Sequence, residues 1–161
     1  MMRMIKTMQP SDVNEASALM RRNLLEINSR NYPEEIIDYL VNDLTPEKLL
    51  EKMETRQLFI ALEGERIIGT GGLANYGSQD EPSYYGVLFF VLPELHRQGV
   101  GKLLVKTAET EARKLGAENI TVRSAIGACE FYEKLGYKYP AGESVRDKLG
   151  NTHMEKTLLP E

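Results

Sequence analysis

A glycine-rich turn between a predicted strand and a predicted helix is the segment of this chain best suited to bind an anion. The apolar run at residues 87–92 ends at Pro93, and residues 96–101 then read His-Arg-Gln-Gly-Val-Gly. A helix N-terminus offers unsatisfied backbone N–H groups and the positive end of the helix dipole. Glycine at 99 and 101 removes Cβ atoms that would keep a phosphate away. The turn therefore predicts a site for an anionic, nucleotide-like ligand.

The elements that position this turn are predicted by hydrophobic periodicity and by turn residues. We expect strands at residues 2–8, 58–62, 67–70, 84–92, 120–122, 137–139 and 153–158, and whether residues 73–76 continue the third strand stays open. We expect helices at about 13–27, 34–42, 46–53, 98–115 and 125–135. This order predicts an α/β fold with a mixed sheet, antiparallel early and parallel around the glycine turn. No repeat, low-complexity tract or linker divides the chain, so we expect a single domain over residues 1–161.

Composition argues against several classes of protein. A net charge of −4 disfavours a nucleic-acid partner. One cysteine, Cys129, allows no internal disulfide, and with only His96 and His153 we expect no metal site. No apolar run approaches the ~20 residues that cross a bilayer, and the N-terminus lacks a signal-peptide core. We therefore expect a cytoplasmic protein without a membrane partner.

Two common nucleotide-binding motifs do not fit the glycine turn. A dinucleotide fold places three glycines after its first strand, whereas this turn has two glycines and lies in mid-chain. A P-loop requires a hydroxyl residue after Gly-Lys, and residues 101–103 read Gly-Lys-Leu. The glycines at 69, 71 and 72 lie among strand-forming residues, so we expect a bulge or close strand packing there instead of a second phosphate loop.

Two sequence blocks resemble the GNAT superfamily of acyl-CoA-dependent N-acyltransferases. Residues 96–101 match its Gln/Arg-x-x-Gly-x-Gly/Ala signature, except that His96 stands in the Gln/Arg position. Residues 131–137 read Phe-Tyr-Glu-Lys-Leu-Gly-Tyr, which is similar to the family's Phe-Tyr-Glu-Lys-Leu-Gly-Phe segment. The family's usual asparagine, seven residues before this tyrosine, is Ala125 here. The resemblance implies a central mixed sheet of six to seven strands flanked by helices.

The resemblance also implies acetyl-CoA as the co-substrate, without a metal. The pyrophosphate would be held by the backbone N–H groups of Arg97, Gln98, Gly99, Val100, Gly101 and Lys102, and Lys102 or Lys106 would add charge. Proline at 93 cannot donate to a sheet ladder, so the central strand can diverge from its neighbour. The backbone groups of Phe90, Val91 and Leu92 would then pair with pantetheine, and one N–H would polarise the thioester carbonyl.

Within the second block, Tyr132 is the candidate general acid, since a phenol can give its proton to the departing thiolate. Taken alone, Tyr132 would be read as ordinary packing at a helix start. The general base stays open, with Glu26, Glu34 and Glu81 as candidates. Tyr84 and Tyr85 are candidates for the acceptor site, and we expect one of them to pack in the core.

The resulting hypothesis is an N-acetyltransferase that transfers an acetyl group from acetyl-CoA directly to a primary amine of a small molecule or peptide. The alternative is a non-catalytic CoA-binding regulatory module. Members of this family often form a homodimer, which stays open here. The acidic stretch at residues 34–43 favours a cationic acceptor such as a polyamine, but a solvated helix face explains it equally well.

Overall fold

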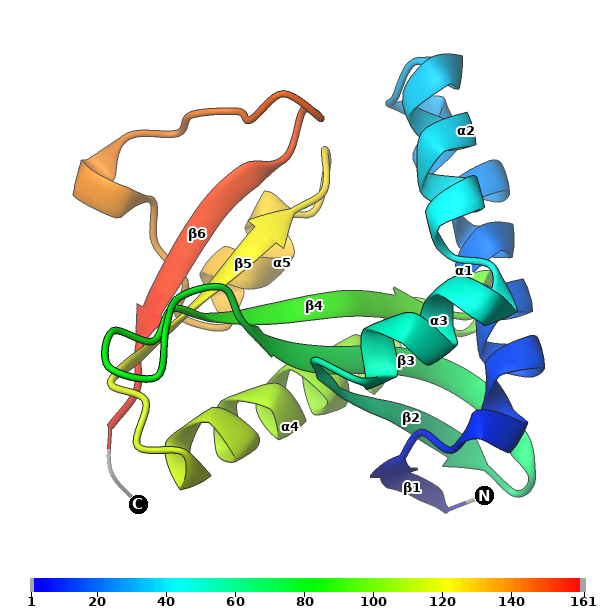
Figure 1. Ribbon diagram of the computed structural model, residues 1–161. Helices are drawn as coiled ribbons and strands as arrows, with labels where there is room; N and C mark the ends of the chain where they lie inside the picture. The colour runs from blue at the N-terminus through cyan, green and yellow to red at the C-terminus, as the bar shows by residue number, and fades with distance from the viewer. Residues whose placement is uncertain (1, 160–161) are drawn as a thin grey trace.

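The computed structural model describes residues 2–159, in which six strands form one sheet in the order β1 to β6 (Figure 1). The strands are β1 (Arg3–Thr7), β2 (Gln57–Glu63), β3 (Arg66–Asn75), β4 (Tyr84–Val91), β5 (Asn119–Ser124) and β6 (Thr152–Thr157). The helices are α1 (Val13–Glu26), α2 (Glu34–Asp43), α3 (Pro46–Met53), α4 (Val100–Lys114) and α5 (Cys129–Lys134), with 3-10 turns η1 (Pro10–Asp12), η2 (Asn28–Arg30), η3 (Pro93–Leu95) and η4 (Pro140–Gly142). Among the described strands, β4 and β5 pair in parallel and the other neighbours pair antiparallel, which confirms the predicted mixed sheet.

Helices cover both faces of the sheet. Helix α4 packs against β2, β3 and β4 on one face, and α1 packs against β3 and β4 on the other (Figure 1). Each helix buries one stripe of apolar residues, as an amphipathic helix does on a sheet; the buried apolar residues of α4 are Val100, Leu104, Val105, Ala108 and Ala112. None of the helices within residues 2–159 is long and apolar enough to span a membrane.

The glycines of β3 allow this close packing. A Cβ on Gly69 would lie 2.8 Å from Leu104 Cδ1 of α4, and one on Gly71 would lie 2.7 Å from the Phe59 ring. The register between β3 and β4 also shifts between Thr70 and Gly72. We expected a bulge or close strand packing at these glycines, and the structure shows close packing together with a register shift.

The parallel pair β4–β5 is short, and the two strands then part. Their pairing ends at Gly86 and Val122, although β4 continues to Val91 (Figure 1). Beyond this point β4 has an irregularity at Leu88, which takes a φ of 57° and whose carbonyl accepts a 2.8 Å hydrogen bond from the Thr70 hydroxyl. The predicted divergence is confirmed, but it begins at Gly86, well before the proline that we expected to cause it.

Two expected elements differ in the structure. The helix expected at 125–135 begins only at Cys129, because residues 125–128 form a turn with Gly127 at a φ of 88°. The strand expected at 137–139 is reduced to a single bridge between Lys138 and Glu155. The described sheet therefore has six strands, and α5 is a short helix preceded by a turn.

A buried carboxylate ties α4 to the last strand. Glu109 of α4 is fully buried and accepts a 2.9 Å hydrogen bond from the Tyr137 hydroxyl and bonds of 3.1 and 3.2 Å from Lys156 Nζ of β6. Burial lowers the pKa of Lys156, while the bond to Glu109 opposes that change. Because each charge in this pair satisfies the other, removing one partner would leave an uncompensated buried charge.

Candidate functional site

The glycine turn has the backbone conformation of an anion-binding loop. Arg97 has a φ of 64° and Gly99 a φ of 85°, and α4 begins directly afterwards. Leu103 is the first residue of α4 whose N–H donates a backbone hydrogen bond, to Gly99 O at 3.1 Å. The earlier N–H groups are therefore those that a ligand can use. A Cβ on Gly99 would have nothing within 4 Å, so the space in front of the turn is open.

The first strand holds this turn from behind. Arg3 donates to the backbone oxygen of Gln98 at 2.6 Å and to its Oε1 at 3.3 Å, and is paired with Glu63 of β2 at 3.3 Å. Gln98 Nε2 in turn donates to Glu94 O at 3.4 Å. The side chain of Gln98 is thus engaged within the protein. Arg3 could not be found from its sequence position, which is far from the turn.

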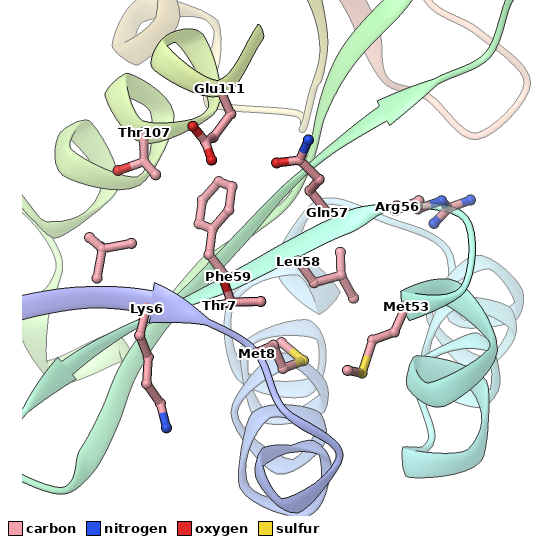
Figure 2. A pocket seen from close by; sticks show the side chains of 11 residues that line it. Lys6, Thr7, Met8, Met53, Arg56, Gln57, Leu58, Phe59, Thr107 and Glu111 are labelled. Carbon is pink, nitrogen blue, oxygen red and sulfur yellow. The ribbon is translucent and has the colours of Figure 1, made fainter. Parts of the chain in front are cut away.

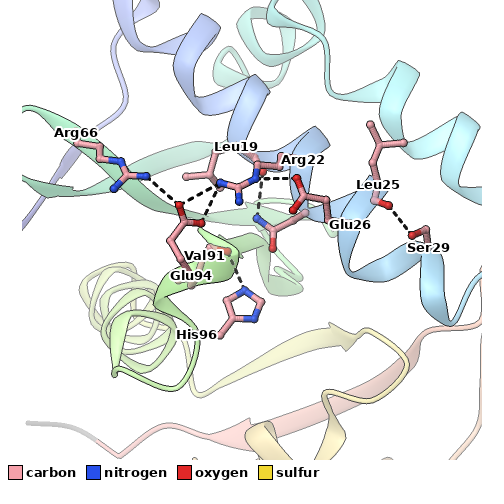
Figure 3. Close-up of polar contacts among 10 residues, drawn as sticks. Leu19, Arg22, Leu25, Glu26, Ser29, Arg66, Val91, Glu94 and His96 are labelled. Atoms are coloured by element: carbon pink, nitrogen blue, oxygen red, sulfur yellow. Dashed lines mark hydrogen bonds and ion pairs between the residues drawn. The ribbon is translucent and has the colours of Figure 1, made fainter.

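His96 bonds the end of the central strand. Its Nε2 lies 2.9 Å from Val91 O (Figure 3). Leu92 has both backbone groups engaged: its N–H donates to Ile68 O at 3.0 Å, and its carbonyl accepts from Leu95 N at 2.9 Å. This corrects the expectation that Leu92 pairs with pantetheine.

The register shows which backbone groups of β4 face the opening. Phe90 lies opposite Thr70 and Val91 opposite Gly69. The Leu92 N–H bonds β3. Because polar groups alternate along an antiparallel strand, Phe90 also directs its groups toward β3, and Val91 directs its groups away. Of the three expected pantetheine partners, Val91 is the one whose backbone groups are directed away from β3.

Tyr132 lies buried at the contact of α5 with the start of α4. Its ring packs edge-on against Phe131 at 5.1 Å and Tyr137 at 5.6 Å between centroids. A Cβ on Gly101 would lie 3.3 Å from the Phe131 ring, so α5 sits close to the glycine turn. Burial raises the pKa of the Tyr132 phenol well above its usual value. The side chain is thus both a packing residue and a phenol that keeps its proton.

The three acidic candidates for the base occupy different places. Glu26 is paired with Arg22 at 2.8 Å, Glu34 opens α2 on the surface, and Glu81 lies in the exposed β3–β4 loop. Arg22 also pairs with Glu94 at 2.9 Å, so the Glu26 carboxylate is part of a surface ion-pair network (Figure 3). The structure does not bring the three carboxylates together.

Of the two tyrosines at the start of β4, Tyr84 packs against the core, as expected for one of them. Tyr85 instead contacts residues of β6. Its hydroxyl lies 3.5 Å from His153 Nδ1, and His153 Nε2 lies 3.1 Å from Asp147 Oδ2. Sequence reasoning missed this chain of three side chains, because they come from two strands and a loop with no shared spacing.

Tyr32 connects the N-terminal helices to the C-terminal half of the molecule. Its hydroxyl donates to Asn151 Oδ1 and accepts a 2.8 Å bond from the Ile126 N–H. Asn151 N in turn donates to Asp147 Oδ1 at 3.0 Å. Burial raises the pKa of Tyr32, so its hydroxyl stays protonated. This one side chain therefore fixes both the turn after β5 and the loop that carries Asp147.

A cavity of about 430 Å³ lies elsewhere, between the middle of α4 and strands β1 and β2 (Figure 2). Phe59, Thr107 and Glu111 face it. Thr107 and Glu111 lie beyond the first turn of α4, and the cavity does not include the glycine turn or the opening between β4 and β5. Within residues 2–159, no three histidine, cysteine or carboxylate side chains gather as a metal site would require.

Comparison with known proteins identifies the family. The family model of the acetyltransferase (GNAT) domain matches residues 28–158. The chain therefore belongs to the GNAT acetyltransferases, a family of acyltransferase enzymes. This confirms the resemblance that the glycine turn and the 131–137 block predicted.

Solved structures with this fold cover nearly the whole chain. PaiA N-acetyltransferase from Thermoplasma acidophilum, in complex with coenzyme A, is 19% identical with a TM-score of 0.81, over 98% of this chain and 99% of that chain. A GCN5-related N-acetyltransferase from Rhodopseudomonas palustris is 22% identical with a TM-score of 0.79, over 98% and 97%. An aminoglycoside 6'-N-acetyltransferase complexed with coenzyme A is 18% identical with a TM-score of 0.74, over 98% and 98%. No curated protein sequence matches the chain significantly.

Proposed function

We propose that this acetyltransferase moves an acetyl group from acetyl-CoA directly to a primary amine of a small molecule or peptide. The observation that carries the proposal is the glycine turn at the start of α4, lying at the end of a strand that has parted from its parallel neighbour. When bound, acetyl-CoA supplies an electrophilic thioester carbonyl and a thiolate leaving group. The open space at Gly99 and the free N–H groups of the turn fit its pyrophosphate.

The turn would bind the pyrophosphate through the N–H groups of residues 97–102. Lys102 is exposed at the first turn of α4, where its ammonium adds to the positive end of the helix dipole. Lys106 lies one turn further and is partly engaged with Glu109 at 3.6 Å. Lys102 is therefore the better placed of the two lysines for a phosphate. Two structures of the same fold contain coenzyme A, which supports coenzyme A as the ligand of this family fold.

Val91 would be the pantetheine partner on β4, since its backbone groups face the opening. Its carbonyl oxygen lies 2.9 Å from Nε2 of His96, the residue that stands at the Gln/Arg position of the family signature. We infer that His96 positions the Val91 carbonyl and leaves its N–H to pantetheine. His96 would thus act on coenzyme A binding indirectly, by holding the end of β4 in place.

Tyr132 would act as the general acid. Its raised pKa keeps the phenol protonated at neutral pH, and within residues 2–159 its hydroxyl makes no hydrogen bond that would hold the proton back. A thiolate formed by amine attack would accept that proton. Tyr132 is thus both a core residue and the proposed proton donor.

Acetyl-CoA binding and turnover test the proposal together. At a concentration of 100 times Kd, acetyl-CoA should stabilise the protein by about 2.7 kcal/mol in thermal unfolding. Thiol release should then appear with at least one amine of a varied panel. Absence of stabilisation would overturn the proposal. Stabilisation without thiol release for any amine would instead favour the non-catalytic CoA-binding module.

A further inference from the structure

Two arginines and two tyrosines form a cluster on the sheet, which we call the arginine–tyrosine cluster: Arg56, Tyr76, Tyr85 and Arg123. The guanidinium carbon of Arg123 lies 4.8 Å from the Tyr76 ring centroid and 5.1 Å from that of Tyr85. The guanidinium carbon of Arg56 lies 5.6 Å from the centroid of the same Tyr76 ring. The two tyrosine rings pack edge-on, with their centroids 5.0 Å apart. A guanidinium held against aromatic faces keeps its in-plane N–H donors free.

The cluster lies where β4 and β5 begin to part. Tyr85 precedes Gly86, the last residue of β4 that pairs with β5, and Arg123 directly follows Val122, its partner. Both side chains therefore stand at the base of the opening in which we place the thioester. Only about two residues, roughly 7 Å of strand, separate Gly86 from the irregularity at Leu88.

Tyr85 of the cluster also lies on the face from which an acceptor can approach. Gly69 faces α4, and residues alternate along β3, so Ala74 points to the opposite face. Tyr85 is the register partner of Ala74 and shares that face, where α1 packs farther along the sheet. Since α4 covers the other face, an amine would reach the opening past the arginine–tyrosine cluster.

The arginines of this cluster carry uncompensated charge. Among residues 2–159, no carboxylate lies within ion-pair distance of Arg56 or Arg123. The neighbouring Asp147 is occupied by His153 and by the N–H groups of Leu149 and Asn151. The other nearby acid, Glu155, is exposed on β6 opposite Thr121.

We infer that the acceptor amine carries an oxyanion, a carboxylate or a phosphate, and that Arg123 binds it. This inference rests on the proposed acetyl transfer, and it names the substrate class. A planar guanidinium can donate to two oxygens of such a group. Because Arg123 lies next to the opening, an amine a few bonds from the anion would reach into it. Of the acidic residues of α2, Asp43 is paired with Lys52 at 3.0 Å.

A matched amine panel tests the inference. The acceptors are 4-aminobutyrate, 3-aminopropylphosphonate, 1,4-diaminobutane and butylamine, which differ chiefly in the group opposite the amine. For Arg123→Gln we expect KM for the two anionic amines to rise about 10- to 100-fold, as for a lost charged hydrogen bond. KM for acetyl-CoA and for butylamine should stay unchanged. Arg123→Lys should restore part of the loss, because it keeps the charge without the fork.

The control is Lys48→Gln, which removes the same charge from an exposed position on α3. It should leave all four amines unaffected. Preference of the wild type for diaminobutane, or an equal loss for butylamine in Arg123→Gln, would overturn the inference. The ratio of the KM values for 4-aminobutyrate and 3-aminopropylphosphonate then shows which of the two anions the site prefers.

Calorimetry of 4-aminobutyrate and 3-aminopropylphosphonate, titrated into the protein saturated with CoA, separates this inference from the proposed function. Binding that weakens at least 10-fold in Arg123→Gln supports the anion site even if no amine is acetylated. Acetylation without any anion binding or preference would leave the enzyme proposal intact and overturn this one. A thermal melt of Arg123→Gln should match the wild type, because the side chain is exposed.

Discussion

At the scale of single residues, one side chain often serves two purposes in this protein. Tyr132 was open to two readings from the sequence, packing and acid catalysis, and its burial supports the first without excluding the second. Burial removes water from the phenolate, which raises the pKa and keeps the proton in place. His96 differs from the family signature, yet its contact with the Val91 carbonyl gives it a place at the same strand end.

Tyr132→Phe should lower kcat about 10²- to 10⁴-fold while the Kd for acetyl-CoA stays within a factor of two, because only the proton donor is lost. Stopped-flow thiol release and calorimetry measure the two quantities. Because the phenol pKa is raised, the wild type should lose no activity through Tyr132 between pH 7 and 9. Unchanged kcat in this variant would leave Tyr132 a packing residue only.

At the scale of elements, the short connections carry the geometry of the site. The turn before α4 is held by β1 through Arg3, and the loop before β6 is held by the segment between α1 and α2 through Tyr32. Helix α5 was expected to start at residue 125. The Ile126 N–H is bonded to the Tyr32 hydroxyl, so residues 125–128 form a turn. A tertiary hydrogen bond therefore accompanies the loss of local helical structure.

Tyr32→Phe should lower the free energy of unfolding by about 1–2 kcal/mol, because the Ile126 N–H loses its acceptor. Urea unfolding measures this change. Hydrogen exchange at Ile126 should accelerate, and KM for the amine should rise more than KM for acetyl-CoA, since the loop that carries Asp147 loosens. Tyr39→Phe, on the exposed side of α2, is the matched control and should show none of these changes.

At the scale of the whole molecule, the two halves of the sheet part at β4 and β5, and buried contacts must hold them together elsewhere. Glu109 does so on the α4 face by linking that helix to β6 through Lys156. Tyr137 adds a second bond at 2.9 Å. Helix α4 therefore packs against β4 on one side of the opening and is bonded to β6, the neighbour of β5, on the other.

Lys156→Met should destabilise the protein by about 3–5 kcal/mol, because the fully buried Glu109 carboxylate loses the cation 3.1 Å away, while Lys106 lies 3.6 Å from it. Urea unfolding measures the loss. The double variant with Glu109→Leu should regain a large part of it, since no charge then remains buried. Lys134→Met removes an exposed lysine paired with Glu130 and should change stability by less than about 0.5 kcal/mol. An equal effect of both single variants would contradict a role for the buried pair.

The sequence by itself determined the features that depend on neighbouring residues: the glycine turn, the 131–137 block, the order of strands and helices and, through them, the family. It also placed the divergence of the central strand, although not its starting point. Tertiary structure alone decided which groups face the opening. Strand register turned Leu92 toward β3, and Arg3 and Tyr32 reach the site from distant elements. The arginine–tyrosine cluster likewise joins four separate segments. Periodicity reports which residues are buried, whereas alternation across a folded sheet decides which of them meet.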